Sequence, residues 1–503
     1  MRAILLIHRY LAVAVGLLMV LWCLSGFVMM YQSFPRLEPE QQLAGLAPLE
    51  LENCCNLGEV ELGQDGPLPA FRLEMLLGDP ILRFNGSAVR GPNGTSSALN
   101  LRTGEPLAEL SPEQILAVAQ QFGRGNAIPG EARSLGLVDI DQWTLQTARR
   151  NAPTWHFAFD DPAHTEIYVS ARTGEVFQKT TRRERVLSWF GAIPHWLYPT
   201  VLRQNGALWT EIVVWTSVAG TFLAATGLYV GLSRLRRNRQ GQLSSPFRGW
   251  WYWHHVSGLV FGILALTWVF SGLLTMNPWG TLSGGPTPHR SELVGESTWK
   301  DLRDFLQQVQ GRADLQQFKR IEHSPFNHRF FVIAEKQGEP AVRLDIEGRA
   351  ALMTAGEVDT ALKNLSTPVR EWELLQQEDA YYYGHKQDVS LPVYRVLLDD
   401  AEGTRLYINP VTGAVRALTA QGRLSRWIRT GLHDMDFAFL RARPVWDIVV
   451  MLLLAGVTSL CVIGTWLALK RVRMDWRIQR GRWRRRMEQR QSVHATRTEV
   501  SEP

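Results

Sequence analysis

The chain has 503 residues, of which 45% are hydrophobic and 20% are charged, and its net charge is +6. This length allows two or three domains, and the composition, which includes 19 tryptophans, excludes disordered and low-complexity chains. Four cysteines are too few for a disulfide framework, so the composition also excludes a cysteine-rich secreted scaffold.

Four apolar segments are long enough to cross a bilayer, which takes about 20 apolar residues in a helix. These segments are 4–30, 212–232, 256–276 and 448–469. The last three contain no charged side chain, and the first is apolar apart from His8 and Arg9 near its start. The first segment is also too long for the apolar part of a signal peptide. We therefore expect four transmembrane helices in contact with a lipid bilayer.

The distribution of lysine and arginine predicts how these helices are oriented. The short connection 234–248 carries five arginines and no acid, and the tail from residue 470 carries eleven basic and four acidic residues. We therefore expect both termini and the connection to be cytoplasmic, and the long polar stretches to be periplasmic, in a bacterial inner membrane. A basic tail can bind nucleic acid, but beside a helix end it favours a topology signal, so we expect no nucleic-acid partner.

The apolar and polar stretches divide the chain into eight parts. These are a membrane helix (1–32), a periplasmic domain (33–188), an interfacial segment with a membrane helix (189–233), a cytoplasmic loop (234–249), a membrane helix (250–277), a periplasmic domain (278–426), an interfacial segment with a membrane helix (427–470) and a basic tail (471–503). Both periplasmic domains are predicted to be α+β. Helical spacing follows the N-caps Ser111 and Thr298, and strand-like runs end in glycine turns. We expect two such modules in each domain.

The order of helix, outer domain and helix occurs twice, and the two halves match in sequence. Without a gap, the first and third helices place His8 on His254, Gly16 on Gly262, Trp22 on Trp268 and Ser25 on Ser271, while the second and fourth place Glu211 on Asp447 and Gly220 on Gly456. Upstream, EIYVSARTGEV matches RLYINPVTGAV, and WFGAIPH matches WIRTGLH. We predict a four-helix bundle built as a tandem duplication, with parallel halves about a pseudo-twofold axis along the membrane normal.

Histidines recur at both ends of both halves. His8 and His254 lie at the start of the first and third helices, and His195 and His433 precede the second and fourth. Parallel halves would bring each pair together at one membrane surface, where two facing imidazoles can provide both axial ligands of a haem. A single interfacial histidine is more often a headgroup contact or a helix cap, so spacing alone leaves both interpretations open.

Other chemistries have weaker support. The chain has no glycine-rich nucleotide motif, no CxxC pair and no hydrolase motif. Cys54 and Cys55 are adjacent and could form a vicinal disulfide, but unpaired thiols are the favoured expectation. Transport is disfavoured because the membrane segments hold almost no ionisable groups.

The strings HHVSGLVFG, FSGLLTMNPWG, LPVYRVLLDDAEGTRLYINPVTG and LHDMDFAFL with RPVWDIVV resemble the PepSY-associated transmembrane family of bacterial inner-membrane proteins, often labelled iron-regulated. The likeness covers nearly the whole chain. The best-understood members are haem-b ferric-siderophore reductases with two haems near opposite membrane faces. The resemblance implies that His8, His195, His254 and His433 are axial ligands, with His255 as the competitor of His254.

The function implied is electron transfer from a cytoplasmic reductase or quinol to a periplasmic ferric siderophore, with release of Fe(II). Arg203, Arg441 and Arg443 lie near the outer histidines and could bind haem propionates or act as interfacial anchors. Residues 381–383, all tyrosines, and His385 could line a chelate site, although strand packing is favoured. The alternatives are a PepSY anchor that binds a periplasmic protein and a component of siderophore or iron transport.

Overall fold

The structure is a computed structural model. It describes residues 2–57, 61–62, 67–86, 89–91, 94–237, 239–280, 282, 288–384 and 389–499. Below, the first half of the chain means residues 2–234 and the second half means residues 250–499.

Four helices in the described part of the chain are long and apolar enough to cross a membrane, as the sequence predicts. They are α1 (Arg2–Met29), α8 (Gly206–Arg234), α9 (Trp250–Thr275) and α14 (Val445–Glu499). All four point large apolar side chains outward, for example Leu17, Phe222, Ile263 and Leu452, each more than half exposed. Such a surface is costly in water but matches lipid tails. The helices therefore indicate a multi-pass membrane protein.

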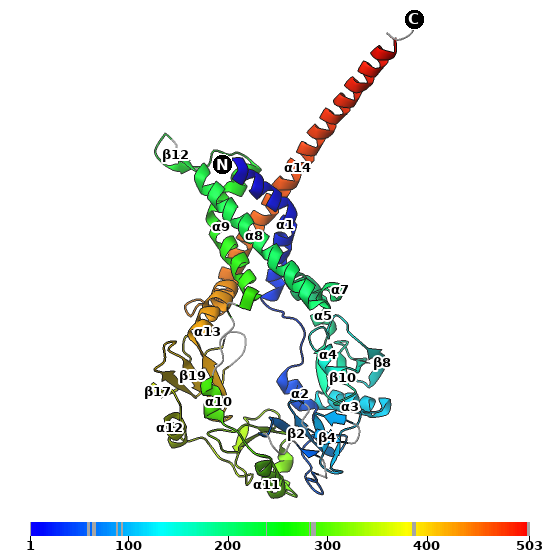
Figure 1. Ribbon diagram of the computed structural model, residues 1–503, viewed down its shortest axis with the longest axis vertical. Coiled ribbons are helices and arrows are strands. Elements are labelled where there is room, and N and C mark those ends of the chain that lie inside the picture. Colours follow the sequence, from blue (N-terminus) through cyan, green and yellow to red (C-terminus); the bar gives the residue numbers. More distant parts are fainter. Residues whose placement is uncertain are drawn as a thin grey trace.

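The four helices pack as a closed ring. α1 contacts α8 and α14, and α9 contacts the same two helices, so α1 stands opposite α9. Figure 1 shows the start of α1, the hairpin of β12 (Arg236–Arg237) and β13 (Leu243–Ser244), and the long extension of α14 at one end of this bundle. We call this the loop end. At the opposite end, the domain end, the chain enters the two outer regions.

The outer region of the first half alternates short helices and strands. Its elements are α2 (Pro39–Gly45), β1 (Glu61–Leu62), β2 (Phe71–Leu76), β3 (Asp79–Phe84), β4 (Val89–Gly91), β5 (Gly94–Ser96), β6 (Ala98–Asn100), β7 (Glu105–Pro106), α3 (Pro112–Gly125), β8 (Ala132–Val138), α4 (Ala148–Asn151), β9 (Thr154–Phe159), β10 (Glu166–Ser170), β11 (Val176–Thr180), α5 (Arg182–Phe190), α6 (Ala192–Trp196) and α7 (Thr200–Arg203).

The outer region of the second half has the same character. Its elements are the 3₁₀ helix η1 (Pro278–Gly280), α10 (Pro288–Val294), α11 (Trp299–Val309), the 3₁₀ helix η2 (Ala313–Gln317), β14 (Arg320–His323), β15 (Val332–Glu335), β16 (Val342–Leu344), α12 (Ala355–Lys363), β17 (Val369–Leu375), β18 (Val393–Leu398), β19 (Arg405–Ile408), β20 (Val415–Leu418), α13 (Ala420–Ser425) and the π-helix η3 (Arg426–His433). Both outer regions are α+β, as predicted.

The predicted helix starts are confirmed. The Ser111 hydroxyl accepts from the backbone N–H of Gln114, and the Gln114 side chain accepts from the Ser111 backbone, which completes a capping box. Thr298 and Asp301 form the same box at the start of α11. The strand-like runs that the sequence predicts become the antiparallel pairs β10 with β11 and β19 with β20.

The two outer regions share one sheet. Its seven strands run in the order β16-β15-β14-β2-β3-β6-β7, and β14 of the second half pairs with β2 of the first, with Ile321 opposite Leu73. Trp299 and Phe305 of α11 pack in the same core as Leu73. The other two modules are separate four-stranded sheets, β11-β10-β9-β8 and β17-β18-β19-β20. In Figure 1 the two regions leave the bundle on different sides and meet at the far end, near β2 and α11.

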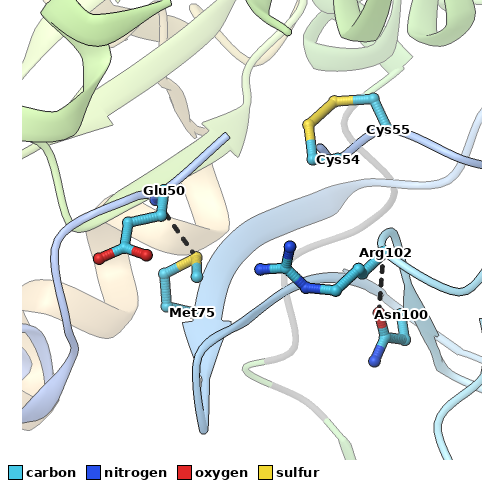
Figure 2. Close-up of a disulfide and its surroundings, with 6 residues drawn as sticks. All are labelled: Glu50, Cys54, Cys55, Met75, Asn100 and Arg102. Atoms are coloured by element: carbon cyan, nitrogen blue, oxygen red, sulfur yellow. Dashed lines mark hydrogen bonds between the residues drawn. A yellow bond between two sulfur atoms is a disulfide. The ribbon is translucent and has the colours of Figure 1, made fainter. Parts of the chain in front are cut away.

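Cys54 and Cys55 form a disulfide in this structure, so the expectation of unpaired thiols is wrong. Cys55 has a positive φ of 78°, a backbone conformation that the sequence around it does not predict. The backbone N–H of Asn56 donates to the carbonyl of Leu101 and fastens the segment to the shared core. Figure 2 shows the disulfide near Arg102.

Candidate functional site

The structure brings the four histidines together in the two expected pairs. His8 on α1 faces His254 on α9 at the loop end, with ring centroids 6.4 Å apart. His195 on α6 faces His433 at the end of η3, with ring centroids 6.3 Å apart. Ser25, which contacts His195, follows His8 by 17 residues on α1, a rise of roughly 26 Å along a helix. The two pairs therefore lie at opposite ends of the bundle.

The ring of His8 is oriented by the neighbouring helix α8. Its Nδ1 lies 3.1 Å from the carbonyl oxygen of Leu223, so Nδ1 carries the proton and donates to it. A Cβ on Gly227, one turn further along α8, would lie 2.7 Å from the Cε1 of His8, so only glycine lets the ring approach this closely. This arrangement leaves Nε2 as the nitrogen with a lone pair.

The ring of His254 approaches α14 as closely as the ring of His8 approaches α8, since a Cβ on Gly464 would lie 2.7 Å from its Cε1. The carbonyl of Leu460 lies near the ring, but Nδ1 of His254 is buried without a hydrogen-bond partner among the described residues, unlike Nδ1 of His8. These contacts pair Gly227 with Gly464. The sequence alignment, which pairs Gly220 with Gly456, would place Gly227 one residue earlier on α14. The close approach of these two glycines to the histidine rings therefore shifts the alignment of α8 with α14 by one residue near the loop end.

A cavity of 590 Å³ opens beside the loop-end pair. All four membrane helices contribute to its wall, which is mostly apolar and contains His8 and His254. Glycines give it flat surfaces, namely Gly16, Gly227, Gly231, Gly258, Gly262 and Gly464. Its volume falls within the range of about 300–1,000 Å³ that is typical of cofactor and small-molecule sites. Arg9 and Arg471 also line it and were not predicted from the sequence.

At the domain end, serine hydroxyls of the membrane helices orient the histidines. His195 Nδ1 lies 3.0 Å from Ser25 Oγ and 3.2 Å from the carbonyl of Trp22. His433 Nδ1 lies 3.2 Å from Ser271 Oγ, the serine that the sequence aligns with Ser25. Burial, together with the neighbouring His433, lowers the pKa of His195 to about 4. The His195 ring is therefore neutral at pH 7.

The spacing of both pairs fits one metal ion between two imidazoles. A metal-bound imidazole nitrogen lies about 2.0–2.1 Å from its ion, so two rings on opposite sides of one ion have centroids roughly 6.3 Å apart. Among the described residues there is no group of three or more His, Cys, Asp or Glu side chains that could hold a metal by themselves. A pair of imidazoles suits a metal that brings its remaining ligands with it, as haem iron does.

The competitor, His255, also lines the cavity, but its ring already has hydrogen-bond partners. Its Nε2 donates to the carbonyl of Gly231 at 2.9 Å, and its Nδ1 lies 2.9 Å from Ser245 Oγ. Both ring nitrogens are engaged, so the geometry favours His254 as the partner of His8.

The arginines proposed for propionates have other partners. Arg203 lies over the rings of Tyr198 and Trp209, 5.1 and 4.6 Å from their centroids. Arg443 forms an ion pair with Asp447. The Nε of Arg203 is buried without a hydrogen-bond partner among the described residues, so propionate binding and interfacial anchoring both stay predictions for these two arginines.

Arg441 belongs to a buried cluster that the sequence did not predict. Tyr383 lies between the guanidinium groups of Arg426 and Arg441, at 4.8 and 4.1 Å, and donates to the carboxylate of the fully buried Asp436 at 2.7 Å. Burial and this hydrogen bond raise the pKa of Tyr383 to about 12. The cluster fixes the outer region to the segment that carries His433.

The rest of the tyrosine run serves packing, as favoured. Tyr382 stacks on Tyr407 with ring centroids 5.1 Å apart, and Tyr381 accepts a hydrogen bond from the indole of Trp427. His385 lies outside the described residues.

No protein-family model matches the chain, and no curated protein matches it. The membership suggested by the motif strings therefore stays a prediction.

Proposed function

We propose that this protein is a di-haem b oxidoreductase of the bacterial inner membrane. It takes electrons from a cytoplasmic reductase or a quinol and delivers them to a periplasmic ferric siderophore, which releases Fe(II) because the reduced ion binds hard oxygen donors less tightly. The proposal includes a tandem duplication, cytoplasmic termini and PepSY-type outer regions in the periplasm. The observation that carries it is the pair of facing imidazoles at each end of an apolar bundle, at 6.4 and 6.3 Å.

The chain's own groups prepare His8 and His195 as ligands. The carbonyls of Leu223 and Trp22 accept from the Nδ1–H groups of His8 and His195, so that Nε2 is the donor nitrogen of each. The apolar helices exclude water and fix the ring planes. Haem, when bound, supplies one-electron chemistry, and its surroundings set the potential.

The test is the haem content and spectrum of the protein purified in detergent, oxidised and then reduced with dithionite. We expect two haems per chain with sharp bands in the reduced state. The variants His8→Ala and His433→Ala should each lose one haem. His255→Ala is the matched control and should keep both, because His255 faces Gly231 and Ser245.

Two outcomes would overturn the proposal. One is a colourless protein after expression with ample haem, which would favour a PepSY anchor instead. The other is equal haem content in His8→Ala and in the His255→Ala control. If two haems are present, the dithionite-reduced protein should be reoxidised by ferric siderophore but not by the same siderophore without iron.

A further inference from the structure

The mouth of the cavity at the loop end carries more positive than negative charge. Arg9 of α1 and Arg471 of α14 both line the cavity. Asp475 lies between them, 3.2 Å from Nη1 of Arg9 and 3.3 Å from Nε of Arg471. One carboxylate thus serves two guanidinium groups, so these three described side chains carry a net charge of +1.

Arg9 also has an unpaired N–H donor. Its Nε is buried and has no hydrogen-bond partner among the described residues. A buried N–H without an acceptor is costly, and folded proteins almost always satisfy such groups. Together with the positive charge, this unpaired donor makes the mouth suited to an anionic acceptor.

The position that corresponds to Arg9 in the second half carries no arginine. The sequence alignment that pairs His8 with His254 pairs Arg9 with His255, whose two ring nitrogens are both engaged by Gly231 and Ser245. The two arginines that line the cavity are both bridged by Asp475, so this positive charge lies where α1 and α14 meet. An amphiphilic ligand would lie with its acidic edge toward Arg9 and its apolar body between the histidines.

We propose that Arg9 and Arg471 form a carboxylate-binding site for a planar amphiphilic ligand, with Asp475 positioning the two guanidinium groups. The inference rests on the proposed function, because the ligand that fits the His8–His254 pair is haem and the carboxylates are its propionates. The site sets which way the macrocycle lies in the cavity. Arg9 and Arg471 thereby take, at the loop end, the role that the sequence suggested for arginines at the domain end.

The experiment compares haem with haem dimethyl ester, which lacks the carboxylates. Both are titrated into full-length apoprotein carrying His433→Ala, so that only the loop-end pair is left to bind. We expect haem to bind at least roughly tenfold more tightly than the ester, because charge-assisted hydrogen bonds to a carboxylate are among the strong ones. Arg9→Gln should abolish this preference. Arg473→Gln, an exposed arginine on α14 outside the cavity lining, should retain it.

A second readout does not depend on the His433→Ala background. In the otherwise unchanged protein, Arg9→Gln should lower the midpoint potential of one haem and leave the other unchanged, because a nearby positive charge favours the added electron. Equal affinity for haem and its ester, or an unchanged preference in Arg9→Gln, overturns this inference and leaves the proposed function standing. Failure of the wild-type protein to bind any haem overturns both.

Discussion

In the first half of the chain, the histidine of the opening helix meets the Leu223 carbonyl and the flat surface at Gly227. In the second half, His254 lies against Gly464 and near the Leu460 carbonyl, but its Nδ1 has no hydrogen-bond partner among the described residues. The agreement extends to the serines that contact the outer histidines. It stops where the chain leaves the bundle.

At the exits, aligned positions carry different residues. Arg9 aligns with His255, and the buried Ser188 aligns with Arg426 of the Tyr383 cluster. The features that match are those that orient imidazoles, and the features that differ are those that meet the surroundings of each end. This contrast indicates that the histidine geometry is what the two halves have in common, while the residues at the exits are not shared.

The largest expected effect comes from filling the space beside a histidine. Gly227→Leu should displace His8 and remove the loop-end haem, and Gly464→Leu should do the same through His254, because a Cβ at either position lies 2.7 Å from the ring. Gly356→Leu on α12, outside the bundle, is the control, since the nearest atom to its Cβ would be 4.0 Å away. Haem per chain is the measurement. Full haem content in one of the two leucine variants would break the equivalence of the halves.

The next effect concerns the sheet that joins the halves. His323 on β14 is buried and stacked on Phe71 of β2, with ring centroids 4.9 Å apart. Burial lowers the pKa of His323 to about 4, and Asp301 offsets this only in part. As the pH falls, His323 is therefore protonated near pH 6.5 in the unfolded chain but only near pH 4 in the folded protein. The neutral His323 contributes its full share to the free energy of unfolding above pH 6.5. This contribution should fall by about 3 kcal/mol as the pH drops toward 4.

The control for this prediction is His323→Phe, which keeps a ring on Phe71 and cannot titrate. The free energy of unfolding is measured against pH for both proteins in detergent. The difference between the two curves should change between pH 6.5 and 4 and be flat above. Parallel curves across this range would show that His323 is accessible to protons in the folded state.

A smaller effect is expected from the serines at the domain end. Ser25→Ala removes a hydroxyl that accepts from His195, and Ser271→Ala removes the corresponding hydroxyl at His433. Changes to groups that orient a metal ligand typically weaken metal binding by about 10–100-fold. We expect Ser25→Ala to fall near the low end, because the Trp22 carbonyl remains 3.2 Å from Nδ1. The measurement is the affinity for the haem at the domain end. The affinity for the haem at the loop end should be unchanged in both variants.

Much of this architecture could be predicted from the sequence because it rests on local patterns. Apolar length gives the four helices, the repeat gives the pairing of the histidines, and the capping residues give the starts of α3 and α11. The carbonyls of Leu223 and Leu460 could not be predicted, since a backbone group has no residue-specific signal. The one-residue register difference on α14 follows from those carbonyls and was missed for the same reason.

The shared sheet is the largest feature that sequence reasoning missed. β2 and β14 are separated by more than 240 residues, and each alone reads as an ordinary strand of its own domain. A strand pairs through backbone groups that every residue carries, so its partner is decided by which edge is brought close. Arg9 was overlooked for a related reason. In sequence it is one charge beside a membrane helix, and only the packing of α14 shows that it faces a cavity.

The smallest effect tests how far the two halves are joined. Ser111→Ala and Thr298→Ala each remove the hydroxyl of a capping box, at a cost of about 1 kcal/mol. The two variants should lose similar free energies of unfolding, but the strands that are destabilised should differ. α3 packs in a core made of first-half residues alone, which includes Leu76 of β2 but no residue of β14, whereas the core of α11 contains residues of both β2 and β14. Hydrogen exchange should therefore accelerate in β8–β11 but not in β14 for Ser111→Ala, and in both β2 and β14 for Thr298→Ala. If Thr298→Ala leaves β2 unchanged, the halves are stabilised separately despite their common sheet.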